Sequence, residues 1–216
     1  MKKVITGLLI ITVLAASAYF GVQQYRLAEV LNTLRPTVQL ASNYLDEFYA
    51  LEGNPEGISL AEYCEKANAA LNDLDKELVG LKRRSGTEHD ELYSIVALHI
   101  ETSQQSIREF SAYARHRLDH ESAKESADDS VAKLQTSRNH RELKITRTHA
   151  EIAIKDLKEA RLKSEKSMAL VYASAALVKS QRHVLENRFG TKSVVSRDRL
   201  DYILNKFNGE PGKNSV

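Results

Sequence analysis

One pair of side chains in this sequence has the spacing of metal ligands. His116 and His120 stand four residues apart, so on a helix they share one face. Asp119 and Glu121 lie next to the second histidine. Two ligands from one helix are too few for a tight site, and a metal would need a third ligand from another element. We therefore expect both histidines to be surface residues, and we assign no metal site.

Catalytic and cofactor motifs are absent from the sequence. It contains no Glu-x-x-His pair of a di-iron bundle, no paired histidines of a zinc protease and no CxxC or CxxCH. It also lacks glycine-rich phosphate loops and the GxSxG element of serine hydrolases. The sequence therefore predicts a protein that is not an enzyme and holds no cofactor.

A few polar or reactive residues interrupt otherwise apolar repeats. Cys64 is the single cysteine, so it cannot form an internal disulfide, and we expect it to pack as a small hydrophobic residue. An interchain disulfide is the alternative. Ser103, Arg161 and Arg182 also occupy apolar positions, where polar residues commonly fix helix register or partner choice.

Charge is sorted along the chain. Residues 39–130 hold 19 acidic and 9 basic residues, whereas residues 133–199 hold 16 basic and 7 acidic. The simplest interpretation is complementarity between neighbouring helices of one chain. The functional alternative is an exposed basic surface that docks an acidic protein, an anionic glycan or lipid head groups, formed by Arg138, Arg141, Lys144, Arg147, Lys155 and Lys158. Aromatic residues do not alternate with these bases as stacking on single strands requires, so we expect no nucleic acid partner.

The beginning of the chain predicts a membrane anchor. Residues 4–22 are 19 uncharged, mostly apolar residues, which as a helix would be about 28 Å long, close to the hydrocarbon thickness of a bilayer. Lys2 and Lys3 precede this run and favour a cytoplasmic N-terminus with the body outside the cytoplasm. We expect the inner membrane and periplasm of a bacterium. A cleaved signal peptide is the alternative, because Ala16-Ser17-Ala18 fits cleavage after Ala18.

The rest of the chain divides into a helical body and a tail. We assign residues 1–25 to the anchor, 26–207 to an extracytoplasmic helical bundle and 208–216 to a disordered tail. Apolar residues recur at alternating steps of three and four in two stretches, 27–48 and 60–81, which predicts two helices with one buried seam each. Pro36 kinks or interrupts the first helix, and a turn at 53–57 separates the two.

Two much longer helices should follow. Residues 87–189 contain neither glycine nor proline. A reversal at 137–140 would place Leu134 opposite Leu143 and Leu118 near Leu157; a reversal within 121–130 is the alternative. The shorter helices can cover only part of such a hairpin, so we predict a four-helix base with a protruding two-helix stalk, its tip pointing away from the membrane. Residues 193–207 form an amphipathic segment that either packs on the base or lies on the bilayer.

The predicted class is all-α: an anchor helix followed by an elongated antiparallel bundle with a long coiled-coil hairpin. From this architecture we expect a single-pass membrane-tethered scaffold or adaptor that binds another protein of the cell envelope through its helix faces. Its partners would be the bilayer and that protein, with a homo-oligomer as a further option. The alternative is a small-ligand-binding, sensor-like bundle, anchored or secreted after cleavage, with a cavity lined by Ala69, Ala70, Ala173 and Ala175.

Overall fold

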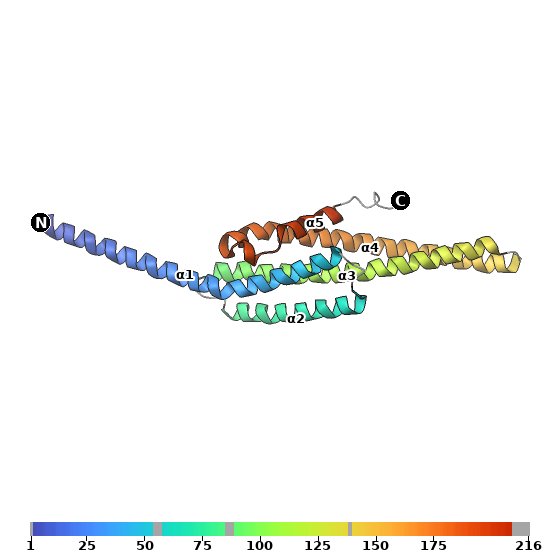
Figure 1. Ribbon diagram of the computed structural model, residues 1–216, viewed down its shortest axis with the longest axis horizontal. Helices are drawn as coiled ribbons and strands as arrows, with labels where there is room; N and C mark the ends of the chain where they lie inside the picture. Colours follow the sequence, from blue (N-terminus) through green and yellow to red (C-terminus); the bar gives the residue numbers. More distant parts are fainter. Residues whose placement is uncertain (1, 54–57, 85–88, 138–139, 209–216) are drawn as a thin grey trace.

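The computed structural model is built from helices and has an elongated shape (Figure 1). It describes residues 2–53, 58–84, 89–137 and 140–208, with the side chains of residues 2–16, 53, 84 and 140 excepted. The predicted turn at 53–57 and the predicted tail beyond Asn208 therefore lie outside the described residues, apart from the end of the first helix at Gly53.

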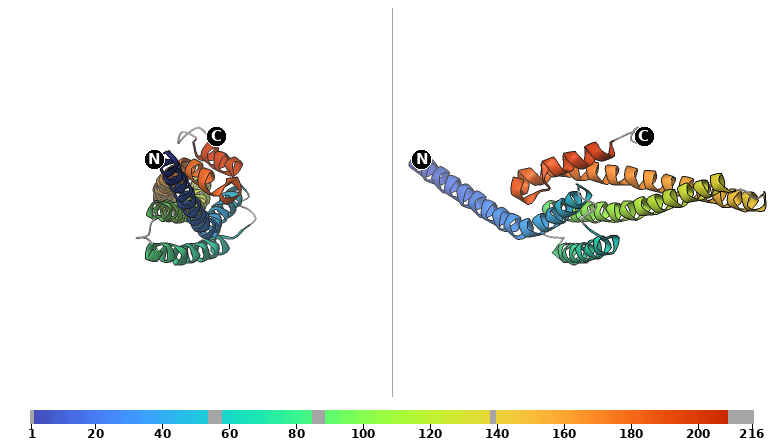
Figure 2. Two further views of the ribbon diagram at one scale, coloured as in Figure 1. Left: turned by 90° about the vertical axis from the view of Figure 1, so that its left-hand side faces the viewer. Right: turned by 45° about the vertical axis from the view of Figure 1, so that its right-hand side comes forward.

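The first helix, α1 (Lys2–Gly53), has a free half and a packed half. Its N-terminal half projects alone from one end of the molecule, and the helix bends where it enters the bundle (Figure 2). Pro36 lies inside α1 and has no N–H to donate to the carbonyl of Asn32, so we attribute the bend to this residue. From Leu34 onward the predicted seam is confirmed, with side chains at most 1% exposed at Leu34, Val38, Ala41, Leu45 and Phe48.

The second helix, α2 (Leu60–Arg84), begins where the sequence predicts. The Glu62 N–H donates to Ser59 Oγ at 3.2 Å, as expected for an N-cap residue. The buried face is rotated from the predicted seam, however, because Tyr63 and Ala70 are buried while Cys64 and Leu71 are only partly so. A heptad pattern locates a helix face to within about one residue, and the neighbouring helices decide the rest.

The two long helices, α3 (Asp90–Thr136) and α4 (His140–Phe189), form one antiparallel hairpin. The predicted reversal between 137 and 140 is confirmed, and the alternative within 121–130 is excluded because α3 continues through it. Residues 138–139 at the tip are outside the described part of the chain. The hairpin extends well beyond α1 and α2 at the end opposite the N-terminus (Figure 1).

The hairpin therefore divides into two parts. We call residues 118–136 of α3 and 140–165 of α4 the stalk, and the remaining helices with the packed half of α1 the base. Within the described stalk residues, only Ala127, Ala150 and Ala153 are buried. Apart from these three alanines, the buried core lies in the base.

The end of the chain packs on the base. A short 3₁₀ turn, η2 (Thr191–Ser193), leads into α5 (Arg197–Phe207), and Gly190 allows the turn because its φ of 90° suits glycine. Leu200, Ile203 and Phe207 are buried against the bundle. Of the two predicted positions for this segment, packing on the base is confirmed.

Aromatic rings concentrate at the end of the base from which the stalk emerges. Tyr49 packs on Phe110 with ring centroids 5.3 Å apart, and Phe207 contacts both Phe110 and Tyr113 at 6.1 and 5.1 Å. These rings join α1, α3 and α5, which are distant in sequence. Their burial fixes the end of α1 and the start of the stalk relative to each other.

Most of the run at 4–22, the predicted anchor, lies outside the residues whose side chains are described. The described residues include no helix both long and apolar enough to cross a bilayer. Tyr19, Phe20 and Tyr25 are exposed on the free half of α1.

Candidate functional site: the outer face of α4

Polar side chains on the facing sides of α3 and α4 define their register. Gln181 Nε2 donates to Thr102 Oγ1 at 2.8 Å, and Ser174 Oγ donates to Ser106 Oγ at 3.3 Å. Nearer the tip, His116 Nδ1 lies 2.5 Å from Ser167 Oγ, and Ser137 Oγ lies 3.3 Å from Thr146 Oγ1. These polar contacts recur along the hairpin and show which face of α4 is turned inward.

This register corrects the pairing predicted from the apolar residues. His116 lies opposite Ser167, so Leu118 lies about two helical turns away from Leu157, its predicted partner. Leu143 and Ile145 are 38% and 51% exposed instead of forming a seam with α3. The buried side chains among the described stalk residues are alanines, which matching large apolar residues could not reveal.

The candidate basic residues lie on the opposite, outer face of α4. Arg141, Lys144, Arg147, Lys155 and Lys158 are all exposed, and their spacing places them within one sector of the helix. Arg138 lies outside the described residues. The structure thus places the five described bases together on the stalk, facing away from α3.

Acidic residues on the same helix neutralise these bases only in part. Arg147 Nε lies 3.0 Å from Glu151 Oε1, and Lys155 Nζ lies 3.9 Å from Glu159 Oε1. These are exposed pairs at i,i+4, which contribute little to stability and exchange readily with solvent or another partner. Residues 141–159 hold five basic residues and four acidic ones, Glu142, Glu151, Asp156 and Glu159, so the acidic residues do not fully neutralise the bases.

An apolar stripe, which the sequence analysis missed, runs beside the bases. Ile152 and Leu162 are 53% and 56% exposed, and Leu170, Leu177 and Val184 are exposed by 49%, 48% and 44%. The last three recur every seven residues, and that spacing was the signal available in the sequence. We define the outer face of α4 as the five described bases together with these five apolar residues.

The part of this face that belongs to the base carries no negative charge. Residues 166–185 contain Lys166, Lys179, Arg182 and His183 but no aspartate or glutamate. Lys179 and Arg182 are turned toward the C-terminal segment, where they bind Asp201 Oδ1 at 2.8 Å and the Val195 carbonyl at 3.0 Å. An apolar helix face without acidic residues suits an acidic amphipathic helix and disfavours a second basic one.

The histidines do not gather into a metal site. His116 binds Ser167, His120 is half-buried, and among the described residues no cluster of three or more His, Cys, Asp or Glu could hold a metal ion. His149 is exposed, and the side chain of His140 lies outside the described part.

His99 is buried in the base and is 2% exposed. Its Nε2 lies 3.2 Å from Ser42 Oγ. Burial lowers the pKa of the imidazole to about 4, so the ring is neutral at pH 7.

The remaining polar candidates contact residues of their own or of a neighbouring helix. Cys64 is partly exposed, with its Sγ 3.5 Å from an Arg115 guanidinium nitrogen. Ser103 is buried and donates to the His99 carbonyl at 2.8 Å, while the exposed Arg161 pairs with Glu165. Arg182 is the only one of the three intrusions predicted from the seams that ties two elements together, through its bond to the Val195 carbonyl.

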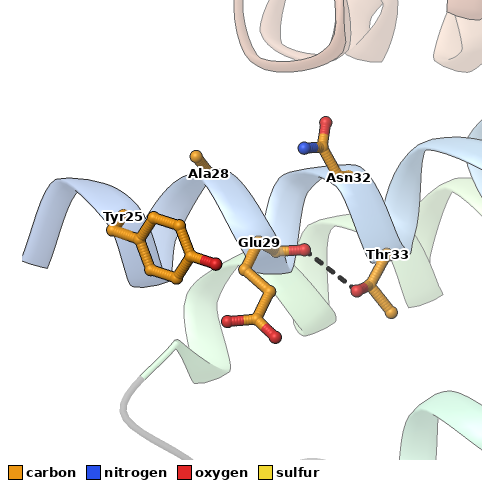
Figure 3. A pocket seen from close by; sticks show the side chains of 5 residues that line it. All are labelled: Tyr25, Ala28, Glu29, Asn32 and Thr33. Carbon is orange, nitrogen blue, oxygen red and sulfur yellow. Dashed lines mark hydrogen bonds between the residues drawn. The ribbon is translucent and has the colours of Figure 1, made fainter. Parts of the chain in front are cut away.

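The cavity expected for small-ligand binding does not form from the four alanines. Ala69 and Ala173 are exposed, whereas Ala70 and Ala175 are packed with no exposed surface. A hollow on the free half of α1, lined by Tyr25, Ala28, Glu29, Asn32 and Thr33, has a single helix as its wall (Figure 3). Its polar groups partly satisfy each other, since Thr33 Oγ1 donates to the Glu29 carbonyl at 2.9 Å.

Comparison with known proteins gives no relative from which a function could be transferred, because no family model, curated protein or solved structure matches the chain.

Proposed function

We propose that the protein is a membrane-tethered scaffold or adaptor whose outer α4 face binds an acidic helical partner in the cell envelope. The observation that carries this proposal is the stalk. It extends far beyond the base, buries three alanines among its described residues, and yet presents an ordered row of bases and apolar side chains. A long structure with so little core of its own is suited to presenting a surface.

The position of α1 supports the tether. Its free N-terminal half projects from the end of the molecule opposite the stalk tip (Figure 1). A helix anchored through residues 4–22 would hold the base near the bilayer and direct the stalk away from it. With the N-terminus in the cytoplasm, the body would lie in the periplasm or its equivalent.

Charge reversal of the outer face tests the proposal. The variant carries Lys144→Glu, Arg147→Glu, Lys155→Glu and Lys158→Glu, and the control carries Lys76→Glu on α2, where the side chain is 76% exposed. Both should fold, because all substituted side chains are exposed. The complex extracted from membranes in mild detergent should be lost in the fourfold variant and kept in the control, as native gel electrophoresis would show. A complex of unchanged size in the fourfold variant would refute the proposal.

The same gels distinguish a homo-oligomer from a complex with another protein. A complex that contains only this chain, as its mass would reveal, supports self-association instead of an adaptor. Because residues 166–185 lack acidic residues, two such faces would offer each other no opposite charges, and we expect a second protein.

A further inference from the structure

A second feature of the base is a cleft beside the root of the stalk. It has a volume of about 310 Å³ and lies among the end of α1, the beginning of α2 and the middle of α3. This volume is at the lower end of the range for ligand pockets. Its wall is apolar over much of its area, through Leu51, Ile58, Leu60, Ala114 and Leu118.

The polar part of the cleft is built around a buried carboxylate. Glu52 is 3% exposed, and its Oε1 lies 2.8 Å from Lys206 Nζ on α5 and 3.5 Å from an Arg117 guanidinium nitrogen. Lys206 also donates to the Glu52 carbonyl at 2.8 Å. Two cations therefore surround one buried anion, so these three groups together carry a net positive charge, and Arg117 is the cation of the two that lines the cleft. Glu121, 3.8 Å from Arg117 Nε, is 60% exposed and compensates it weakly through solvent.

Two buried donors in this wall have no hydrogen-bond partner. Tyr63 is 5% exposed and its hydroxyl has no hydrogen-bond partner. The buried Nε of Arg117 has none either, because its ion-pair contact with Glu121 Oε1, at 3.8 Å, is too long for a hydrogen bond. Burial raises the pKa of the Tyr63 hydroxyl, so it stays protonated and able to donate. An unpaired buried donor costs free energy, and a bound acceptor would recover that cost.

From this arrangement we infer that the cleft binds a small amphiphilic carboxylate, whose anionic head accepts hydrogen bonds from Tyr63 and Arg117 and whose short apolar tail lies against Leu51, Ile58 and Leu118. A cationic ligand is disfavoured because Glu52 is already surrounded by two cations. The inferred site uses none of the residues of the outer face of α4, so it stands independently of the proposed adaptor function.

Binding of short carboxylates to the whole protein tests this inference. The probes are butanoate, hexanoate, octanoate and 3-phenylpropanoate, with octylamine and octanamide as charge controls, and binding is followed by calorimetry and thermal unfolding. We expect octanoate or 3-phenylpropanoate to bind and to raise the unfolding temperature, and the amine and amide to bind at least tenfold more weakly. Absence of binding by all four carboxylates, or equal binding of octylamine, would overturn the inference.

Tyr63→Phe separates the cleft from other binding sites. It removes only the unpaired hydroxyl, so the free protein should fold and be at least as stable as the wild type. Carboxylate affinity should fall about tenfold, the effect of losing a hydrogen bond to a charged group. The matched control is Tyr44→Phe, since Tyr44 bonds Asp73 at 2.9 Å and does not line the cleft. Equal affinity in the Tyr63→Phe variant and the wild type would contradict the assignment.

Discussion

His99 shows how a polar residue is accommodated inside this bundle. The ring is 2% exposed and contacts the hydroxyl of Ser42, a neutral partner. Neutral histidine tolerates such a site, whereas the charged form would lose its hydration without gaining a counter-ion. Lowering the pH should therefore destabilise the helical base through protonation of His99.

We predict that stability falls as the pH is lowered from about 6.5 to 4. Below the ordinary histidine pKa of 6.5 the unfolded chain takes up a proton that the folded protein excludes until about pH 4, so acid favours unfolding. This contribution amounts to roughly 3 kcal/mol across the interval. Denaturant unfolding of the wild type and of His99→Gln at several pH values measures it.

The His99→Gln variant should lose less stability on acidification than the wild type. His149→Gln serves as the control and should follow the wild type, because His149 is exposed. Parallel pH profiles for the wild type and His99→Gln would show that this imidazole does not govern the acid response.

The core of α2 gives a second prediction for single side chains. Leu74 has no exposed surface, so Leu74→Ala should lower the free energy of unfolding by about 2–5 kcal/mol. Lys76→Ala should change it by less than about 0.5 kcal/mol, since the Lys76 side chain is 76% exposed and its ion pair with Asp73 is a surface one. Chemical denaturation of both variants measures these changes. Similar free energies of unfolding for Leu74→Ala and Lys76→Ala would mean that the helix face with Leu74 does not hold α2 in the bundle.

Individual buried residues were partly predictable from the sequence. Heptad spacing identified Leu34, Val38, Leu45 and Phe48 correctly, because large apolar residues at regular steps have few alternatives. The buried Tyr63 and Glu52 were not found, because their burial depends on α3 and α5, which are remote in sequence.

The long helices were predictable, but their relative register was not. The lack of glycine and proline in 87–189 indicated α3 and α4, and the reversal at 137–140 was predicted from matching apolar residues of the two arms. The place of the reversal was right, but the matched pairs were not. Register requires pairwise contacts, and in the stalk these come from Ala127, Ala150 and Ala153, which offer little contrast with their neighbours. Large residues such as Ile145 are left exposed there, so matching them misled the pairing.

The observed register allows the stalk to be shortened while the remaining residues of α3 and α4 keep the same faces turned toward each other. Residues 122–135 and 148–161 face each other if the pairing of Ser137 with Thr146 and of His116 with Ser167 is continued between them. Deleting both segments removes two heptads from each arm. Because the stalk buries only alanines, the free energy of unfolding should change by no more than roughly 3 kcal/mol, while the complex with the partner is lost.

Circular dichroism with thermal unfolding, together with native gels of membrane extracts, measures both effects. A deletion of residues 122–135 alone is the control: it shortens one arm and should disturb the hairpin more. A shortened protein that unfolds at the usual temperature and keeps its complex would place partner binding in the base.

The two ends of the elongated molecule are different. The free half of α1 is at one end, the tip of the stalk at the other, and the five-helix base lies between them (Figure 2). Such an arrangement fits a protein that holds a partner at a distance from the surface to which it is attached. The adaptor proposal depends on this polarity and on the outer face of α4, and on no catalytic group.

The tether predicts where the protein is found in the cell. The product should stay with membranes after high-salt washing, and external protease should reach the body once the outer barrier is opened, because residues 4–22 would hold it by hydrophobic burial. Cell fractionation with mass measurement provides the check. Release by osmotic shock of a chain that begins at Tyr19 would show cleavage after Ala18 and remove the tether.

The most direct test is site-specific photo-cross-linking in cells that make the protein naturally. A photoreactive residue replaces Ile152 or Leu177 on the outer face of α4, or Val79 on α2, which is 50% exposed and serves as the reference position. We predict that one acidic protein is cross-linked from both α4 positions and not from α2, and that the product disappears when Lys155 and Lys158 are changed to glutamate. Cross-links of equal strength from α2, or none from α4, would contradict the account.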